Sequence, residues 1–422
     1  MSALDHRAGR HRDRGIGERA GAAGGHGHGH GHGPAPPSSR RVKILLFAIL
    51  LPLALATVAG LWLTWPGAQP RSGVDVGLGQ RPVQGDVLTA TSAPCTSGGS
   101  DVAGAGSAGQ AKKCISLTVR LTDGDSPGVL IQQVLPDEPS TPRFAVGDHV
   151  VLGYTGGNPS DADSYQIQDF QRGASMLWLA ALFAAAVLLL GRWRGLASLA
   201  ALGFSFLVLV TYLFPAILSG GNPVIVGVLA ASVIMFGVLY LTHGVSAQTS
   251  SAVLGTVLSL ALIGVLGIAF SAATELTGLD DDTAKLIGVL GHGIDARGLL
   301  LAGMLIGALG VLDDVTVTQT SSVWELRRAN PELGARELYT AALRIGRDHI
   351  SSAVNTLALA YTGAVLPVLL IFSLSGQSFG ALVTTQDVAQ EVVRTLVGSI
   401  GLVAAVPITT AIAAVVARRD DI

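Results

Sequence analysis

The residues best placed to do chemistry in this 422-residue chain are two adjacent acids, Asp313 and Asp314. They lie within the stretch GLLLAGMLIGALGVLDDVTVTQTSS, at residues 298–322, which is apolar for about four turns and then abruptly polar. An ionised Asp at the centre of a membrane helix costs roughly 2.5–3.5 kcal/mol on insertion scales. Such residues usually face a bundle interior or a water-filled cavity. A carboxylate in that setting can bind a cation or carry a proton.

Helical spacing gives the two acids different neighbours. Asp313 shares a face with Thr316, and Asp314 lies on the adjacent face. The next apolar run begins with Asn355 and Thr356, which fall at a similar depth at ~1.5 Å per residue. We therefore predict a transport site for a cation or proton, with an inner mouth. The site comprises Asp313, Asp314, Thr316, Asn355 and Thr356, and the mouth comprises Arg347, Asp348 and His349.

A structural interpretation of the same acids stays open. In it, the two Asp residues pair with Arg344 or Arg347, or they lie at the membrane interface because the span ends at Leu312. Since the two acids are adjacent and point in different directions, one of them can be an interface residue while the other lines a path.

Enzymatic chemistry finds no support in the sequence. An aspartyl protease needs carboxylates on facing segments that share a proton, whereas Asp313 and Asp314 are neighbours on one helix. Metalloprotease and P-loop motifs are absent from the sequence. We predict no catalytic residue, no cofactor and no metal centre. The run HGHGHGHG, with His26, His28, His30 and His32, is either a loose site for a soft divalent metal or a flexible tail.

Composition predicts the class of protein. The chain is 49% hydrophobic and only 13% charged, which excludes an ordinary soluble protein, and its net charge of −2 gives no general attraction to nucleic acid. Several apolar runs exceed the ~18 residues that cross a bilayer. The fold class expected is an α-helical multi-pass membrane protein with about eight transmembrane helices and a small extracytoplasmic β domain. The eight runs are 43–65, 175–190, 195–218, 223–242, 251–271, 298–318, 351–374 and 396–417.

Charge at the ends of these runs predicts their orientation. Loop 319–350 holds five Arg, the tail at 418–422 holds Arg418 and Arg419, and loop 272–297 is acidic. Basic loops stay in the cytoplasm, so we predict a cell-membrane protein with both termini cytoplasmic. The first run, 43–65, contains a signal-peptidase-like Ala54-Leu55-Ala56, but it is longer than a signal sequence requires. We expect an uncleaved anchor.

Residues 66–174 differ in composition from the rest. They hold four β-branched segments, CISLTVRL, GVLIQQVL, GDHVVLGY and SYQIQDF, which predict strands of a partly open barrel or a sandwich. Cys95 and Cys114 are either a disulfide or two free thiols. The domains expected are a disordered tail (1–42), an anchor (43–65), a β domain (66–174), a seven-helix membrane domain (175–417) and a cytoplasmic tail (418–422).

The membrane part resembles a known family. GMLIGALGVLDDVTVTQTSSVWEL, then NPEL, then ALRIGRDHISSAVNTLALAYTGAVLPVLLIF look like the signature core of the YibE/F-like membrane proteins. The resemblance covers about 165–417 and implies a multi-pass fold but no substrate. Asp314 and the His-rich tail depart from the pattern. The family's motif residues would be Asp313, Asn330-Pro331, Gly346-Arg347-Asp348, Asn355-Thr356 and Tyr361. Tyr361 therefore joins the expected transport site.

Two functions remain as hypotheses. The first is a bacterial permease that moves a small solute, an ion or a proton past Asp313 and Asn355. The second is a membrane scaffold or sensor whose residues 66–174 bind a partner protein of the cell envelope. The expected partners are therefore the lipid bilayer and such an envelope protein, without nucleic acid, and the oligomeric state is left open.

Overall fold

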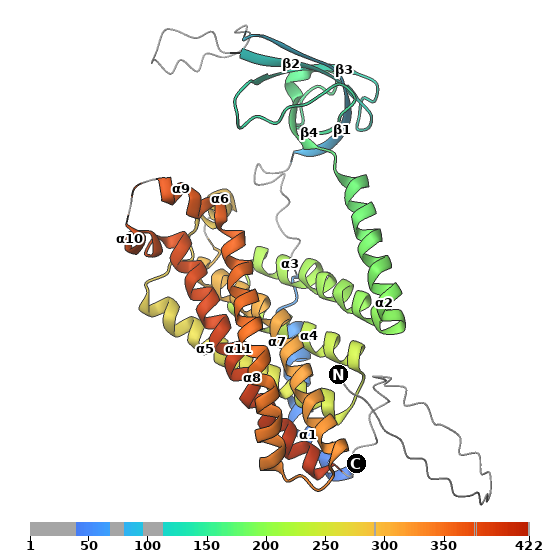
Figure 1. The fold of residues 1–422 in the computed structure, drawn as a ribbon. Helices are drawn as coiled ribbons and strands as arrows, with labels where there is room; N and C mark the ends of the chain where they lie inside the picture. Colours follow the sequence, from blue (N-terminus) through green and yellow to red (C-terminus); the bar gives the residue numbers. More distant parts are fainter. Residues whose placement is uncertain are drawn as a thin grey trace, which may run out of the picture. The chain divides into compact units, whose positions relative to one another are not determined.

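The structure, a computed structural model, describes residues 39–67, 80–95, 113–290, 293–374, 376 and 378–420. The His-rich run and most of the expected N-terminal tail lie outside these residues. Within them, a five-stranded sheet and a set of long helices make two differently built parts (Figure 1).

The sheet is an antiparallel half-barrel. Its strands are β1 (Arg81–Pro94), β2 (Lys113–Leu121), β3 (Leu130–Pro136), β4 (His149–Tyr154) and β5 (Tyr165–Phe170), with a 3-10 turn η1 (Ala162–Ser164) before β5. Their order is β3-β2-β1-β4-β5. The sequence pattern does not predict the long central strand β1. Gly85 and the Pro residues at both ends interrupt its alternation, and its register shifts between Val87 and Thr89.

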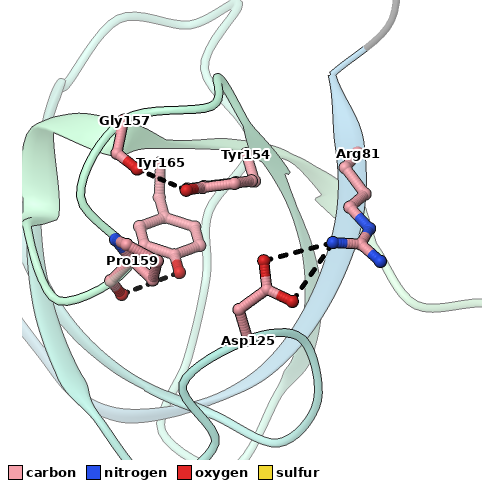
Figure 2. A network of polar contacts seen from close by, with 6 residues as sticks. All are labelled: Arg81, Asp125, Tyr154, Gly157, Pro159 and Tyr165. Atoms are coloured by element: carbon pink, nitrogen blue, oxygen red, sulfur yellow. Dashed lines mark hydrogen bonds and ion pairs between the residues drawn. The ribbon is translucent and has the colours of Figure 1, made fainter.

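Polar contacts draw the two edges of this sheet together. Gln133 on edge strand β3 donates to the carbonyls of Ala162 and Tyr165 at 2.9 Å each. Figure 2 shows that Tyr165 and Tyr154 in turn hold the loop before η1, and Tyr165 donates to Pro159 O at 2.9 Å. Their rings lie 5.2 Å apart. The edges are thus bridged by side chains where no strand ladder joins them.

An ion pair and a disulfide fasten β1. Arg81 makes a forked contact with Asp125 at 3.1 and 3.2 Å, which Figure 2 also shows. Cys95, directly after β1, is bonded to Cys114 in β2, with the two Cα atoms 5.0 Å apart. Of the two alternatives left open by the sequence, the structure contains the disulfide.

The helices account for most of the remaining chain. They are α1 (Arg40–Leu63), α2 (Gly173–Val208), a π-helical turn η2 (Leu209–Leu213), α3 (Phe214–Leu218), α4 (Pro223–His243), α5 (Ala247–Ala273), α6 (Asp281–Leu290), α7 (Ala296–Ala329), α8 (Ala335–Ala364), α9 (Leu366–Leu374), α10 (Phe379–Val383) and α11 (Gln386–Arg419). By length and composition, six helices of the described part could cross a membrane: α1, α2 continuing through α3, α4, α5, α7 and α11.

The longest of these six folds back on itself. Arg192 has φ 50° and ψ −127°, which breaks α2. Beyond the break, a Cβ on Gly195 would lie 2.3 Å from the carbonyl oxygen of Val187. A straight helix would separate these residues by ~12 Å, so the chain reverses here, as the green ribbon in Figure 1 shows. Its two halves correspond to the expected runs 175–190 and 195–218.

The charged loop expected at 319–350 is mostly helical. α7 continues to Ala329 and α8 begins at Ala335, with only five residues between them. The charged residues stabilise the two ends: Arg327 and Arg328 lie in the last turn of α7, and Glu337 accepts from the amide of Gly334 at 2.8 Å. The expected run 351–374 is divided between the end of α8 and α9, so it does not form one continuous helix.

Small residues let the central helices approach closely. A Cβ on Gly255 of α5 would lie 2.2 Å from Thr409 Oγ1 of α11, and one on Gly401 of α11 would lie 2.1 Å from Ile263. On another face, Gly227 of α4 packs against Ala302 of α7. Close backbone approach of this kind is how helices associate in lipid, where apolar burial gives little driving force.

Candidate functional site

A cavity of about 340 Å³ lies between α7, α8 and α11. Three of its polar lining residues, Asp314, Thr318 and Gln319, come from α7, and three, His349, Ser352 and Thr356, come from α8. Leu402 and Val406 of α11 line it as well. The remaining lining is apolar and comprises Val311, Val315, Ile350, Ala353, Leu357 and Ala360, with Gly346.

Helical spacing explains which residues reach this cavity. Asp314 and Thr318 are four apart on α7, and His349, Ser352 and Thr356 follow one another at three and four along α8. Side chains at these spacings share one face of a helix. The cavity is therefore lined by one face of α7 and one face of α8, with polar groups at intervals along otherwise apolar walls.

Gln319 fixes the crossing of the two helices at the end of the cavity. Its Nε2 donates to the carbonyl of Ala342 in α8 at 2.8 Å, and its side chain is only 2% exposed. Gly346 makes room for it, because a Cβ there would lie 2.6 Å from Gln319 Oε1. This buried amide was not among the expected site residues. A Gln inside an apolar helix, directly before Thr320, Ser321 and Ser322, was the available signal.

Asp313 lies on a different face of α7 from the cavity. The residues one turn before and after it, Leu309 and Val317, belong to or pack on the apolar cluster that contains α4. Its Oδ1 is buried and has no hydrogen-bond partner among the described residues. Next to it, Thr316 bonds to Thr256 of α5 across 2.9 Å, and both side chains are fully buried.

The other expected residues are distributed around α8. Asn355 is exposed and does not line the cavity, and neither do Arg347 and Asp348, which are also exposed. Tyr361 is partly buried, and its hydroxyl lies 2.9 Å from where a Cβ on Gly307 of α7 would be. The structure therefore brings Asp314, Thr356 and His349 together, and it separates them from Asp313 and Thr316.

A partly buried ion pair lies outside every expected site. Glu391 and Arg394 of α11 are 2.8 Å apart and only 17% and 24% exposed. Directly before Glu391, Gln390 donates to Asp280, which precedes α6, at 2.9 Å. The expected span began at residue 396, which excluded these residues. An acid and a base three apart in the first turns of a helix was the signal that could have indicated them.

The described residues contain no group of three or more His, Cys, Asp or Glu side chains that could hold a metal ion. Neither Asp313 nor Asp314 forms an ion pair with a described Arg, so the pairing with Arg344 or Arg347 is not formed in the described part of the chain. What the arrangement offers chemically is an acid facing a cavity and, beside it, an acid facing packed helices.

Comparison with known proteins agrees with the motifs in α7 and α8. The profile of the YibE/F-like protein family matches residues 179–419, which is more than half of the chain and contains every residue of the cavity. No curated protein and no solved structure matches the chain. The apolar helices and this match together indicate a membrane protein. The chain belongs to the YibE/F-like protein family.

Proposed function

We propose that this protein is a multi-pass permease that moves a small solute with an apolar body and a cationic end. The observation that carries the proposal is the cavity between α7, α8 and α11, with Asp314 on its wall. Its volume of about 340 Å³ lies in the range of roughly 300–1,000 Å³ typical of small-molecule sites.

The lining supports this class of solute. The walls are mostly aliphatic, which suits an apolar body, and hydroxyls of Thr318, Ser352 and Thr356 can accept or donate at intervals. Asp314 has no ion pair within the described residues, so its carboxylate is available to a cation. An acid held beside apolar walls and left without a basic partner favours a cationic ligand over an anionic one.

The proposed arrangement in the membrane has eight crossings in the cell membrane. They are the six helices long enough to cross, with α2–α3 counted as two because of its reversal at Arg192, and α8–α9 as the eighth. Both termini and the basic ends of α7 and α11 lie in the cytoplasm, and the half-barrel lies outside. In this arrangement the cavity is in the cytoplasmic half of the protein.

The test is uptake of ethidium, an apolar aromatic cation, into proteoliposomes that hold the purified protein. We expect Asp314→Asn to lower the initial rate at least tenfold, because it removes the only acid among the described residues that line the cavity. Asp348→Asn is the matched control, since Asp348 is an exposed acid on α8 that does not line the cavity. Equal rates for Asp314→Asn and wild type, or no uptake by wild type, would overturn the proposal.

A second candidate function is a scaffold or sensor whose half-barrel binds an envelope protein. Edge strand β3 favours it, because Leu130 and Val134 are 58% and 59% exposed there, and a partner could cover them. In that case a gene with Leu130→Ser and Val134→Ser would no longer restore the wild-type phenotype to cells that lack the gene. A gene with Asp314→Asn would still restore it. The opposite pattern would support the permease.

A further inference from the structure

Asp313 is a carboxyl group of α7 that does not line the cavity. Asp313 is next to Asp314 in the chain, but its side chain is about 100° further round the helix and away from the cavity. Its Oδ1 is buried without a hydrogen-bond donor in the described part of the chain. A buried polar atom without a partner costs about 1–3 kcal/mol, and a charged one costs more. Binding a ligand at this carboxyl group would remove that cost.

The helices packed on that side of α7 bring no charge to Asp313. α5 contains no acid, base, His or Tyr along its whole length. The ionisable residues of α4 are Tyr240, whose hydroxyl contacts Ser250 at 3.1 Å, and His243 in its last turn, bonded to Thr242. Gly227 of α4 packs on Ala302 of α7, and the two helices run parallel. His243 is further along α4 from this contact than Asp313 is along α7. Asp313 therefore lies nearer than His243 to the outer end of the two helices.

On the other side of α7, no described charged residue of α8 or α11 forms an ion pair with Asp313. α8 and α11 pack on the cavity side, where His349 is the basic group in the lining. The charged residues of α11 gather at its two ends: Asp387, Glu391, Arg394, Arg418 and Arg419. Those of α8 gather in its first half: Arg336, Glu337, Arg344, Arg347 and Asp348.

A proton fits this position better than a metal ion does. A hard cation takes about six or more oxygen ligands. The hydroxyl beside Asp313 is that of Thr316, and it is already engaged with Thr256 at 2.9 Å and with the carbonyl of Asp313 at 3.3 Å. The residues a turn away, Leu309 and Val317, are apolar. A single proton, by contrast, neutralises a carboxylate and needs no further ligand.

We propose that Asp313 is a proton-binding site, separate from the solute cavity, and that its protonation is coupled to solute movement through Asp314. The coupling rests on the proposed permease function, whereas the proton site does not. The two acids share one peptide unit, so a rotation or shift of α7 that accompanies protonation of Asp313 moves Asp314 relative to α8. The Thr316–Thr256 bond joins α7 to α5 one turn away and limits which shifts are possible.

The proton site is tested first, on the full-length protein in liposomes without any solute. Dicyclohexylcarbodiimide is an apolar reagent that reacts with protonated carboxyl groups. The acid proton moves to a carbodiimide nitrogen, the carboxylate oxygen adds to the central carbon, and the O-acylisourea so formed shifts its acyl group to nitrogen. The product is a stable N-acylurea that peptide mass spectrometry locates. We expect labelling of Asp313 at neutral pH that declines as the pH rises. Asp314→Asn should keep the label and Asp313→Asn should lose it. Labelling of Asp314 instead, or of neither acid, would overturn the site.

Coupling is tested next, by ethidium uptake against its gradient with an imposed pH difference across the membrane. Wild type should accumulate ethidium. Asp313→Asn should let ethidium equilibrate without accumulation, so that its accumulation ratio falls to about one, whereas Asp314→Asn should abolish equilibration as well. Asp313→Glu should restore part of the accumulation, which shows that the variant folds and that a carboxyl is needed. Accumulation by Asp313→Asn equal to wild type would overturn coupling, and absence of all uptake by wild type would overturn the permease while the labelling result stands.

Discussion

The half-barrel and the helical part of this protein distribute polar and apolar side chains in opposite ways. In the half-barrel, Leu117, Val119, Val150 and Leu152 are completely buried, and Ser164 is the one buried polar residue among those described there. The helices bury a series of polar side chains and expose large apolar ones. The fully buried hydroxyls are Ser251, Thr256, Ser259, Ser271, Thr316, Thr409 and Thr410, and the exposed residues include Leu190 at 89%, Trp193 at 82% and Trp178 at 78%.

This contrast shows that the two parts are built for different solvents. In water, an exposed Leu loses the free energy that its burial would provide, roughly 25 cal/mol per Å² of apolar surface. Against lipid tails that penalty disappears, and helices associate through small residues and hydrogen bonds instead. Asp313 and Asp314 belong to the second environment, where each unpaired polar group costs more. Four changes, given in order of falling effect, test the contrast.

The largest effect is expected from truncating the same residue type in each part. Leu117→Ala removes a fully buried side chain from the half-barrel and should lower its free energy of unfolding by about 2–5 kcal/mol. Leu190→Ala removes an 89% exposed side chain and should change the stability of the helical part by less than about 0.5 kcal/mol. Hydrogen exchange of the full-length protein in nanodiscs, read separately for β2 and α2, gives both values. A loss at α2 as large as that at β2 would contradict the contrast.

The second change removes a covalent constraint that only the half-barrel has among the described residues. Cys95→Ser with Cys114→Ser opens a loop with a sequence separation of 19 residues, and the half-barrel should lose about 3 kcal/mol. Reduction of the wild-type protein should give the same loss, and the helical part should keep its protection from exchange in both cases. A loss that spreads to α5 and α7 would show that the two parts unfold as one unit.

How far these features could be predicted from sequence depends on the range of the interactions that set them. The apolar runs at 43–65, 223–242 and 251–271 match α1, α4 and α5 closely, because length and composition decide a membrane helix. The end of α7 and the start of α8 are not predicted by the sequence, because a charged segment indicates a loop but can also form the last or first turns of a helix. β1 was missed because its pairing with β2 and β4 overrides a poor local pattern.

For the candidate site, too, the sequence predicts the features that depend on local geometry and not those that depend on helix packing. Spacing along α7 correctly put Asp313 and Asp314 on different faces, since that depends only on helical geometry. It could not tell what each face meets. That Asp314 faces α8, while Leu309 and Val317 on either side of Asp313 face α4, follows from how the helices pack. Asn355 was expected beside Asp313 from depth alone, but its position around α8 leaves it exposed.

The third change fills a close contact between helices. Gly255→Ala places a methyl group 2.2 Å from Thr409 Oγ1, so α5 and α11 must move apart, and we expect a loss of about 1–3 kcal/mol. Gly303→Ala is the control, because nothing lies within 4 Å of its Cβ position on α7 and the substitution favours the helix. Thermal unfolding in detergent should rank Gly255→Ala below wild type and Gly303→Ala at or above it. The reverse order would mean that α5 and α11 do not pack through Gly255.

The smallest effect is expected at a surface contact of the half-barrel. The hydrogen bond from His149 lowers the pKa of Asp86, and Arg120 contributes in the same direction. Because the folded-state pKa is the lower one, the contact stabilises the fold above the unfolded pKa of about 4 and is lost as the pH falls through the folded value. For partners this exposed the contribution to the free energy of unfolding is below about 1 kcal/mol.

Asp86→Asn should therefore reduce the loss of half-barrel stability below pH ~4, measured as hydrogen exchange of β1 at a series of acid pH values. Asp137→Asn, which removes an acid that has no ion pair in the described part, is the matched control. An unchanged titration in Asp86→Asn would assign the acid sensitivity to other carboxylates.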